Sequence, residues 1–323
     1  MPDYPIKFTP ILQEKIWGGT KLREILNKES HLNNLGESWE ISGVENNISV
    51  VENGALKGLS LNELIREYKD QFLGNKVYQK FGTDFPILIK FIDAQTELSV
   101  QLHPHDDLAK KRHNSFGKTE MWYIMQADEN AEINVGFKKT ISKEEYLKKL
   151  DEGEITKILN FEKVKKGDSF FINTGKVHAI GAGVLLAEIQ QTSDITYRIY
   201  DWDRLDSEGK SRELHTEEAL DAIDFEKKDD YRLEYSKITN ESSNIADCEY
   251  FTTNYLPVKG RVKKDYTTVD SFVIYMCVSG DGEIETNGNS ESIKQGQTIL
   301  IPASNKEVTI SSDGIELLEV YIQ

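Results

Sequence analysis

Two parts of the chain repeat one pattern of short β-strands, and this repeat constrains the fold more than any other feature. Residues 119–133 (TEMWYIMQADENAEI) align with residues 270–284 (DSFVIYMCVSGDGEI) at an offset of 151 positions. Residues 164–180 (VKKGDSFFINTGKVHAI) align with the segment that begins at Ile293 (IKQGQTILIPASNKEVTI) at an offset of 129. The offsets differ by 151 − 129 = 22 residues, about the length of a helix expected within residues 142–160. This indicates two copies of one β module with a helical insertion in the first; chance similarity between β segments is the alternative.

The remaining patterning also favours a mainly β fold. Residues 85–94 (FPILIKFIDA) have the length and branched content of a buried strand, and residues 251–323 alternate between apolar and polar positions with no helix signal. Capping boxes at Ser60 and Ser142 predict two helices, both in the N-terminal part. The polar segment 226–247 is the best boundary. We therefore expect a domain of residues 1–240 with helical insertions and a small β domain of residues 241–323.

Charge and composition exclude several classes of partner. The net charge of −16 argues against nucleic acid and against an anionic membrane surface. An anionic ligand would therefore need a local basic pocket. The N-terminus lacks the pattern of a signal peptide, and no apolar run is long enough to span a membrane. With Cys248 and Cys277 as the only cysteines, the sequence predicts a cytoplasmic protein.

Four side chains predict a metal site. Gln101 and His103 alternate with Leu102 and therefore share one face of a strand, which Pro104 ends. Glu120 stands at the start of a second strand. A third strand carries His178 between apolar neighbours. We expect Gln101, His103, Glu120 and His178 to converge on one zinc-like dication. Taken alone, each histidine is more often an ordinary core or surface residue.

The second copy of the module has lost these ligands. Ser271 stands at the position of Glu120, and Glu307 stands at the position of His178. The sequence therefore predicts one metal ion per chain and a C-terminal module that is structural or a partner surface.

Further charged residues surround the predicted site. Lys118 is two residues from Glu120, where a cation could hold an anionic substrate. Arg198 alternates with apolar neighbours, and a buried arginine needs an anionic partner or ligand. Glu188 and Asp194 lie in the same acidic and aromatic segment. The competing interpretation of these charges is a solvated surface.

Several motifs resemble those of one enzyme family. The segments SVQLHPHD, GKTEMWY and KVHAIGAGVLLAEIQQTSDITYRIYDWDR, with IWGG and GESWEIS near the start, resemble the type I mannose-6-phosphate isomerases in their short bacterial form. The resemblance covers nearly the whole chain. It implies two cupin (jelly-roll) modules and a zinc enzyme that interconverts mannose 6-phosphate and fructose 6-phosphate.

The resemblance also implies roles for individual residues. The family's zinc ligands fall on Gln101, His103, Glu120 and His178, of which Gln101 is the least secure because some short members use only the other three. The family's active-site arginine falls on Arg198 and its substrate-contacting lysine on Lys118, and further acidic site positions fall on Glu188 and Asp194.

An aldose–ketose isomerisation needs a general base close to both C1 and C2 of the sugar. Glu188 and Asp194 are the two candidates, and the sequence does not choose between them. Arg198 would bind an anionic oxygen or the phosphate.

Two other classes of function fit the same residues. Two histidines and one carboxylate on a β-barrel also form the usual site of a non-haem iron oxygenase. A sugar-binding cupin without turnover would keep the barrel, but the four charged residues around the site count against it. The sequence makes no prediction of the oligomeric state.

Overall fold

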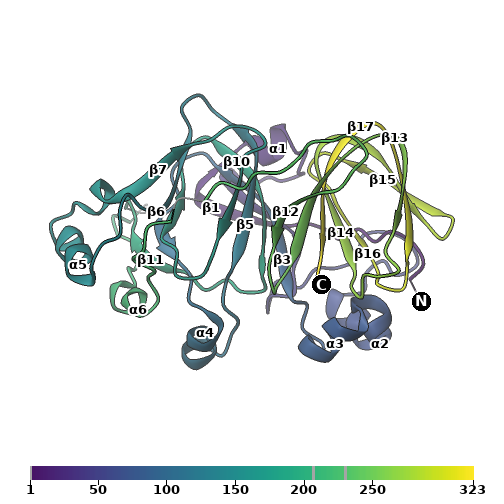
Figure 1. The fold of residues 1–323 in the computed structure, drawn as a ribbon, viewed down its shortest axis with the longest axis horizontal. Helices are drawn as coiled ribbons and strands as arrows, with labels where there is room; N and C mark the ends of the chain where they lie inside the picture. The colour runs from purple at the N-terminus through teal and green to yellow at the C-terminus, as the bar shows by residue number, and fades with distance from the viewer. Residues whose placement is uncertain (1, 206–207, 229–230) are drawn as a thin grey trace.

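The computed structural model describes residues 2–205, 208–228 and 231–323, and its framework is three antiparallel sheets. The first sheet lies at the centre of the molecule (Figure 1). Its strands are, in order across the sheet, β1 (Ile11–Gly19), β2 (Leu35–Ile41), β3 (Ile87–Ala94), β10 (Val184–Gln191), β5 (Glu120–Ala127) and β8 (Ser169–Ile172). Every residue of β3 and β10 is buried, because each of these strands is covered on both faces.

The second sheet packs against one face of the first. Its order is β11 (Tyr197–Tyr200), β4 (Val100–Leu102), β9 (His178–Ile180), β6 (Glu132–Phe137) and β7 (Leu159–Lys163). An apolar core of the facing side chains, including Trp122, Phe170 and Ile133, fills the space between the two sheets. The outer face of the second sheet carries a separate core that the short helices α5 (Lys143–Asp151) and α6 (Thr216–Leu220) help to cover.

The third sheet forms the C-terminal part of the molecule (yellow-green in Figure 1). Its order is β12 (Ser243–Asp247), β13 (Thr252–Asp265), β17 (Glu307–Tyr321), β14 (Val273–Thr286) and β15 (Asn289–Lys294), with β16 (Thr298–Ile301) paired to β14. One apolar cluster joins this sheet to the other face of the first sheet. It contains Phe85, Ile89 and Tyr123 from one side and Phe272 and Leu318 from the other.

Helices occupy the connections between strands. Their bounds are α1 (Lys21–Glu24), α2 (Leu61–Leu73), α3 (Asn75–Phe81), α4 (Asp106–His113), α5 (Lys143–Asp151), the 3₁₀ turn η1 (Ile155–Lys157) and α6 (Thr216–Leu220). The predicted capping box at Ser60 is complete, since Ser60 and Glu63 cap each other at the start of α2. At α5 the Ser142 side chain accepts the predicted hydrogen bond from the amide of Glu145. Residues 251–323 contain no helix, as predicted.

The strand registers test the sequence repeat directly. In the first copy Glu132 pairs with Lys163, and in the second Glu283 pairs with Ser292, which are the positions that the two offsets relate. The helix α5 and the turn η1 lie between the two strands of the first hairpin and are absent from the second. The pairing of β5 with β8 differs from that of β14 with β16 by two residues, so the alignment is not exact along the whole module.

The prediction of a mainly β fold with helical insertions in the N-terminal part is therefore confirmed. His105 caps the start of α4, and His113 is its last residue. Both side chains are exposed. The division at residue 240 stays a prediction; within the polar segment that suggested it, residues 229–230 lie outside the described residues. No helix in the described part of the chain is long and apolar enough to cross a membrane.

Candidate metal centre and active-site cavity

Three strands bring the predicted metal ligands together between the first and second sheets. Gln101 in β4 pairs directly with His178 in β9, so the two side chains share one face. His103 follows β4 and lies on the same side. Glu120 is the first residue of β5 in the opposing sheet. His103, Glu120 and His178 are each 1% exposed.

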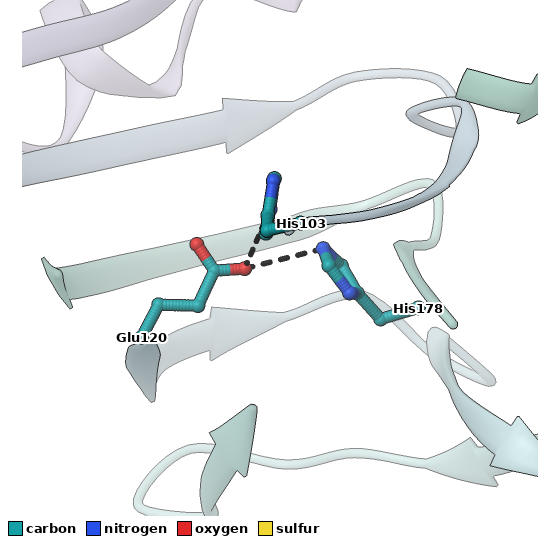
Figure 2. Close-up of side chains that lie close together, drawn as sticks. All are labelled: His103, Glu120 and His178. Carbon is teal, nitrogen blue, oxygen red and sulfur yellow. Dashed lines mark ion pairs between the residues drawn. The ribbon is translucent and has the colours of Figure 1, made fainter. Parts of the chain in front are cut away.

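The carboxylate of Glu120 faces both imidazole rings (Figure 2). Its Oε1 atom lies 3.4 Å from Nε2 of His103 and 3.2 Å from Nε2 of His178. The two ring centroids are 4.8 Å apart. Within the described residues, this is the one group of histidine, cysteine and acidic side chains close enough together to hold a metal ion.

The hydrogen bonds of the two rings fix which nitrogen is free. Nδ1 of His103 donates to the carbonyl of Ile195 at 2.8 Å, and Nδ1 of His178 donates to the carbonyl of Lys176 at 2.8 Å. A carbonyl can only accept, so each Nδ1 carries the proton and each Nε2 of the neutral ring presents a lone pair. This arrangement, with a backbone carbonyl behind each ring, is typical of metal-binding histidines.

The buried nitrogen and oxygen atoms of this cluster are suited to bind a cation. Nε2 of His103 and both carboxylate oxygens of Glu120 are buried without a hydrogen-bond partner. Leaving such atoms unpaired is costly, and two lone pairs facing a carboxylate repel it. A divalent ion placed among them would satisfy all three residues at once. The residues therefore fit the predicted metal.

The electrostatic setting favours the metal-binding protonation states of His103 and Glu120. Burial, reinforced by the positive charge of Lys118, lowers the pKa of His103 to about 3. Burial alone would raise the pKa of Glu120, but the positive charge of Lys118 holds it well below its usual value. A neutral imidazole and an ionised carboxylate are the forms that bind metal.

Gln101 lies beside this cluster. Its amide nitrogen is 3.5 Å from Nε2 of His178, while its Oε1 accepts a hydrogen bond from Ser99. Direct ligation by Gln101 therefore stays a prediction.

A cavity of about 330 Å³ adjoins the cluster, and His178 and Gln101 form part of its wall. Aromatic side chains and a large number of charges line the rest. The charged residues are Lys15, Glu37, Lys90, Lys118, Glu188, Asp194, Arg198 and Arg212. A protein of net charge −16 thus concentrates five cations around one cavity, which is the local basic pocket that an anionic ligand requires.

Glu188 and Lys90 form the cavity wall in the first sheet. They are opposite each other on β10 and β3, and the Lys90 ammonium lies 3.3 Å from the Glu188 carboxylate. Trp122 donates its indole N–H to the same carboxylate at 2.9 Å. Burial and the nearby negative charge of Glu120 raise the pKa of Glu188. Despite its burial, Lys90 has a raised pKa, because Glu37 and Glu188 both stabilise its charge.

The other predicted residues reach the cavity from different elements. Lys118 is 5% exposed, and its ammonium lies 3.5 Å from Oε2 of Glu120. Arg198 pairs with Gln101 across β11 and β4, so it lies on the cavity face of the second sheet. Asp194 is exposed on the loop between β10 and β11. Glu188 and Arg198 therefore lie on two sheets that face the same cavity.

The guanidinium of Arg198 makes only part of the hydrogen bonds available to it. Its NH1 group donates to the carbonyl of Glu213 at 2.8 Å, while its buried Nε has no partner. Burial and the neighbouring Arg212 lower its pKa. Arg212 itself donates two hydrogen bonds to the carboxylate of Asp201 in a bidentate pair.

Sequence reasoning missed the cavity roles of Lys90, Glu37, Trp39 and Trp122. The signal for Lys90 was present, because it interrupts an otherwise apolar buried strand. Glu37 and Trp39 alternate along β2 and so share a face, and the indole of Trp39 donates to Glu37 at 2.7 Å. Nothing in the sequence indicates that this face meets the metal site, because the pairing of β2 with β3 decides it.

The second module carries no counterpart of the cluster. Ser271 accepts a hydrogen bond from the amide of Ile322, and Glu307 is exposed at the start of β17.

Comparison with known proteins finds similarity to one family of isomerases. Residues 6–162 match the family described as "Phosphomannose isomerase type I, catalytic domain", and residues 240–322 match "Mannose-6-phosphate isomerase, cupin domain". The mannose-6-phosphate isomerase of Streptococcus mutans is 34% identical over 310 residues, covering 96% of each chain. A mannose-6-phosphate isomerase of Bacillus subtilis is 35% identical over 305 residues, covering 94% of each chain.

Solved structures agree with the sequence comparisons. The crystal structure of the mannose 6-phosphate isomerase from Bacillus subtilis superposes with a TM-score of 0.89 at 34% identity and covers 99% of this chain and 100% of its own. The predicted cupin architecture is confirmed by these matches.

Proposed function

The chain belongs to the type I phosphomannose isomerase family and is an aldose–ketose isomerase that acts on mannose 6-phosphate, and from this premise we propose that His103, Glu120 and His178 hold its catalytic metal ion and that the ion is zinc. The observation that carries the proposal is the set of buried donor atoms without partners, aimed at one point between two sheets. Two neutral imidazoles and one carboxylate suit zinc and leave a position for substrate or water. Gln101 completes the set as a fourth ligand or as a hydrogen-bond partner of the bound sugar.

The reaction moves a proton between C2 and C1 of the sugar through an enediol. When bound, the ion supplies Lewis-acid polarisation of the sugar oxygens at which negative charge develops. Lys118, 3.5 Å from Glu120, brings a second positive charge to the same region. Its ammonium stabilises an anionic oxygen of the substrate.

Glu188 is the better candidate for the general base. Its raised pKa brings a carboxyl group closer to neutral pH, where an acid–base residue must both take and return a proton. Lys90 and Trp122 hold its carboxylate in a fixed orientation at the cavity wall. Asp194 is the alternative, and its exposed position near the cavity mouth suits a contact with the polar substrate better than proton transfer in a dry site.

Arg198 binds an anionic group of the substrate. Its side chain is half-buried, lines the cavity and leaves Nε without a partner, so a phosphate or sugar oxygen would complete its hydrogen bonding. The planar guanidinium suits the two oxygens of a phosphate, for which lysine is a poorer substitute.

We place the enzyme in the cytoplasm, a proposal that two unpaired cysteines support. The membership of the isomerase family favours isomerase over oxygenase chemistry, although both use similar ligand sets.

The direct test is incubation of the purified protein with mannose 6-phosphate while fructose 6-phosphate is detected by a coupled reaction, before and after chelation. We expect turnover that chelation abolishes, that zinc restores, and about one zinc per chain by elemental analysis. Full turnover in the chelated, metal-free protein would overturn the metal proposal. Iron in place of zinc, with oxygen consumption, would favour the oxygenase.

A further inference from the structure

The carboxylate of Asp106, outside the cavity, joins three separate parts of the chain. Its Oδ1 accepts hydrogen bonds from the amide N–H of Gly117 at 2.7 Å and from the side-chain amide of Gln191 at 3.0 Å. Its Oδ2 accepts one from the hydroxyl of Tyr250 at 2.7 Å. No ion pair to Asp106 exists among the described residues, so these neutral donors alone orient it. Together they hold the pKa of Asp106 below its usual value, although burial opposes this.

Gln191 connects Asp106 to the backbone of Thr119. While its NH₂ group donates to Asp106, its Oε1 accepts from the amide N–H of Thr119 at 2.8 Å. The backbone N–H of Gln191 also donates to the carbonyl of Thr119 at 3.1 Å. Because both ends of the side-chain amide are used, its orientation is fixed.

The two restrained backbone amides, of Gly117 and Thr119, lie on either side of Lys118. Lys118 and Glu120 are both buried, and their charged groups are 3.5 Å apart. A Cβ atom at residue 117 would lie 2.8 Å from the backbone nitrogen of Asp106, so only glycine permits this close approach.

Tyr250 reaches this network from the C-terminal sheet. It lies in the turn between β12 and β13, 144 positions from Asp106 in the sequence. The next residue, Phe251, is fully buried in the shared core, and its carbonyl accepts from the amide of Cys248. The turn that presents the Tyr250 hydroxyl is therefore anchored to the C-terminal module.

We propose that Tyr250 is a positioning residue for the isomerase reaction: it orients Asp106, which with Gln191 fixes the backbone on both sides of Lys118 and so holds Lys118 and Glu120 in place. This inference rests on the roles proposed above for Lys118 and Glu120. It gives the C-terminal module, which has no metal ligands of its own, a part in the reaction carried out in the other module.

The test compares Tyr250→Phe with the matched control Tyr235→Phe. Each change removes one hydroxyl that donates a hydrogen bond to residues of the N-terminal module, from the C-terminal sheet to Asp106 in Tyr250→Phe and from within the N-terminal module to the carbonyl of Gly167 at 2.6 Å in the control. We measure kcat and KM for mannose 6-phosphate, the thermal unfolding midpoint, and zinc affinity by competition with a chelator without substrate. For Tyr250→Phe we expect about a tenfold loss in zinc affinity and in kcat/KM, the size typical of groups that orient a metal ligand. The control is expected to change neither by more than twofold.

A second variant tests the route of the effect. Asp106→Asn keeps the shape of the side chain and is expected to lower the same two quantities, and adding Tyr250→Phe to it is expected to cause no further loss. If Tyr250→Phe lowers only the unfolding midpoint, or if its effect adds fully to that of Asp106→Asn, the positioning role is overturned. Zinc affinity is measured without turnover, so the comparison holds even if the wild-type protein proved to isomerise another sugar.

Discussion

Arg198 is a half-buried cation whose hydrogen bonding the fold leaves incomplete. Its NH1 group bonds only to a backbone carbonyl, its Nε has no partner, and Arg212 lies close enough to lower its pKa. Keeping such a group in a cavity is unfavourable unless a ligand completes it. If Arg198 binds the substrate as proposed, the substrate's anionic oxygens complete its hydrogen bonding, and the arginine then contributes more in the complex than in the free protein.

The first prediction concerns Arg198→Ala. We expect kcat/KM for mannose 6-phosphate to fall by about 100-fold, equivalent to about 2.7 kcal/mol, because a desolvated charge contact with the substrate is lost. Zinc content should not change, since Arg198 does not contact the three ligands. Arg261→Ala is the control, because Arg261 forms an exposed pair with Glu285 on the C-terminal module and should leave the kinetics unaltered. Unchanged kcat/KM in Arg198→Ala with full zinc content would exclude a role in binding or chemistry.

The second prediction concerns pH and the metal-free protein. The folded-state pKa of His103 is about 3, well below the ordinary value of 6.5 that applies in the unfolded chain. Between these two values the unfolded state binds a proton that the folded state does not, so folding stability falls as the pH falls from about 6.5 toward 3. For this group alone the slope approaches about 1.4 kcal/mol per pH unit. The lowered pKa of Glu120 acts in the same direction at the acidic end of this range.

Denaturant unfolding of the chelated protein at several pH values measures this slope. His103→Gln removes the titrating group and should flatten the dependence between pH 6 and 5, where Glu120 still remains ionised in both states. An equally steep slope in the variant would show that other groups cause the acid sensitivity.

At this scale the sequence predicted which side chains meet better than it predicted what surrounds them. His103, Glu120 and His178 were expected to converge from three separate strands, and the fold brings the three together as expected. Lys90 could not be placed, since a lysine inside an apolar strand can equally lie at an edge, and only the pairing of β3 with β10 opposes it to Glu188. Asp106 and Tyr250 are 144 positions apart, and no local pattern joins them.

Among the elements, the junction of α2 and α3 shows most clearly how the two parts of the molecule fit together. Gly74 separates these helices at a φ of +95°. Asp270, which precedes β14, accepts hydrogen bonds from the amides of Asn75 and Lys76 at 2.7 and 3.0 Å and so caps α3 from the other module. A cap supplied from 195 positions away has no sequence signature.

The third prediction follows from this junction. In Gly74→Ala the new Cβ would lie 2.2 Å from the carbonyl oxygen of Asp270, and the residue would keep a backbone conformation that L-residues avoid. We expect a loss of more than about 3 kcal/mol in the free energy of unfolding, measured with denaturant. Gly82→Ala separates the two causes, because Gly82 also has positive φ but its Cβ would meet nothing within 4 Å. That variant should lose only about 1 kcal/mol. Equal losses in both variants would mean that the contact with Asp270 contributes nothing.

For the whole molecule, the shared core predicts that both parts unfold together. One apolar cluster contains side chains from the first sheet, from α2 and from the C-terminal sheet. Phe272 and Phe85 form its clearest contact between the parts, with both side chains fully buried and ring centroids 4.8 Å apart. The proposed division at residue 240 would then separate two modules in sequence without making two independent folding units.

The variant Phe272→Ala tests this with two probes that see different regions. All four tryptophans lie within the first 202 residues, so their fluorescence reports on the N-terminal part, whereas far-UV circular dichroism reports on every sheet. Removing a buried phenylalanine is expected to lower the free energy of unfolding by about 3–5 kcal/mol. The void left by this substitution lies in the core that both parts share. The fluorescence transition of the zinc-loaded protein should therefore move to lower denaturant together with the dichroism transition, although the substitution lies in the other module. A fluorescence transition that stays at its wild-type midpoint while the dichroism becomes biphasic would show that the modules unfold separately, and would make residues 1–240 a catalytic domain able to stand alone.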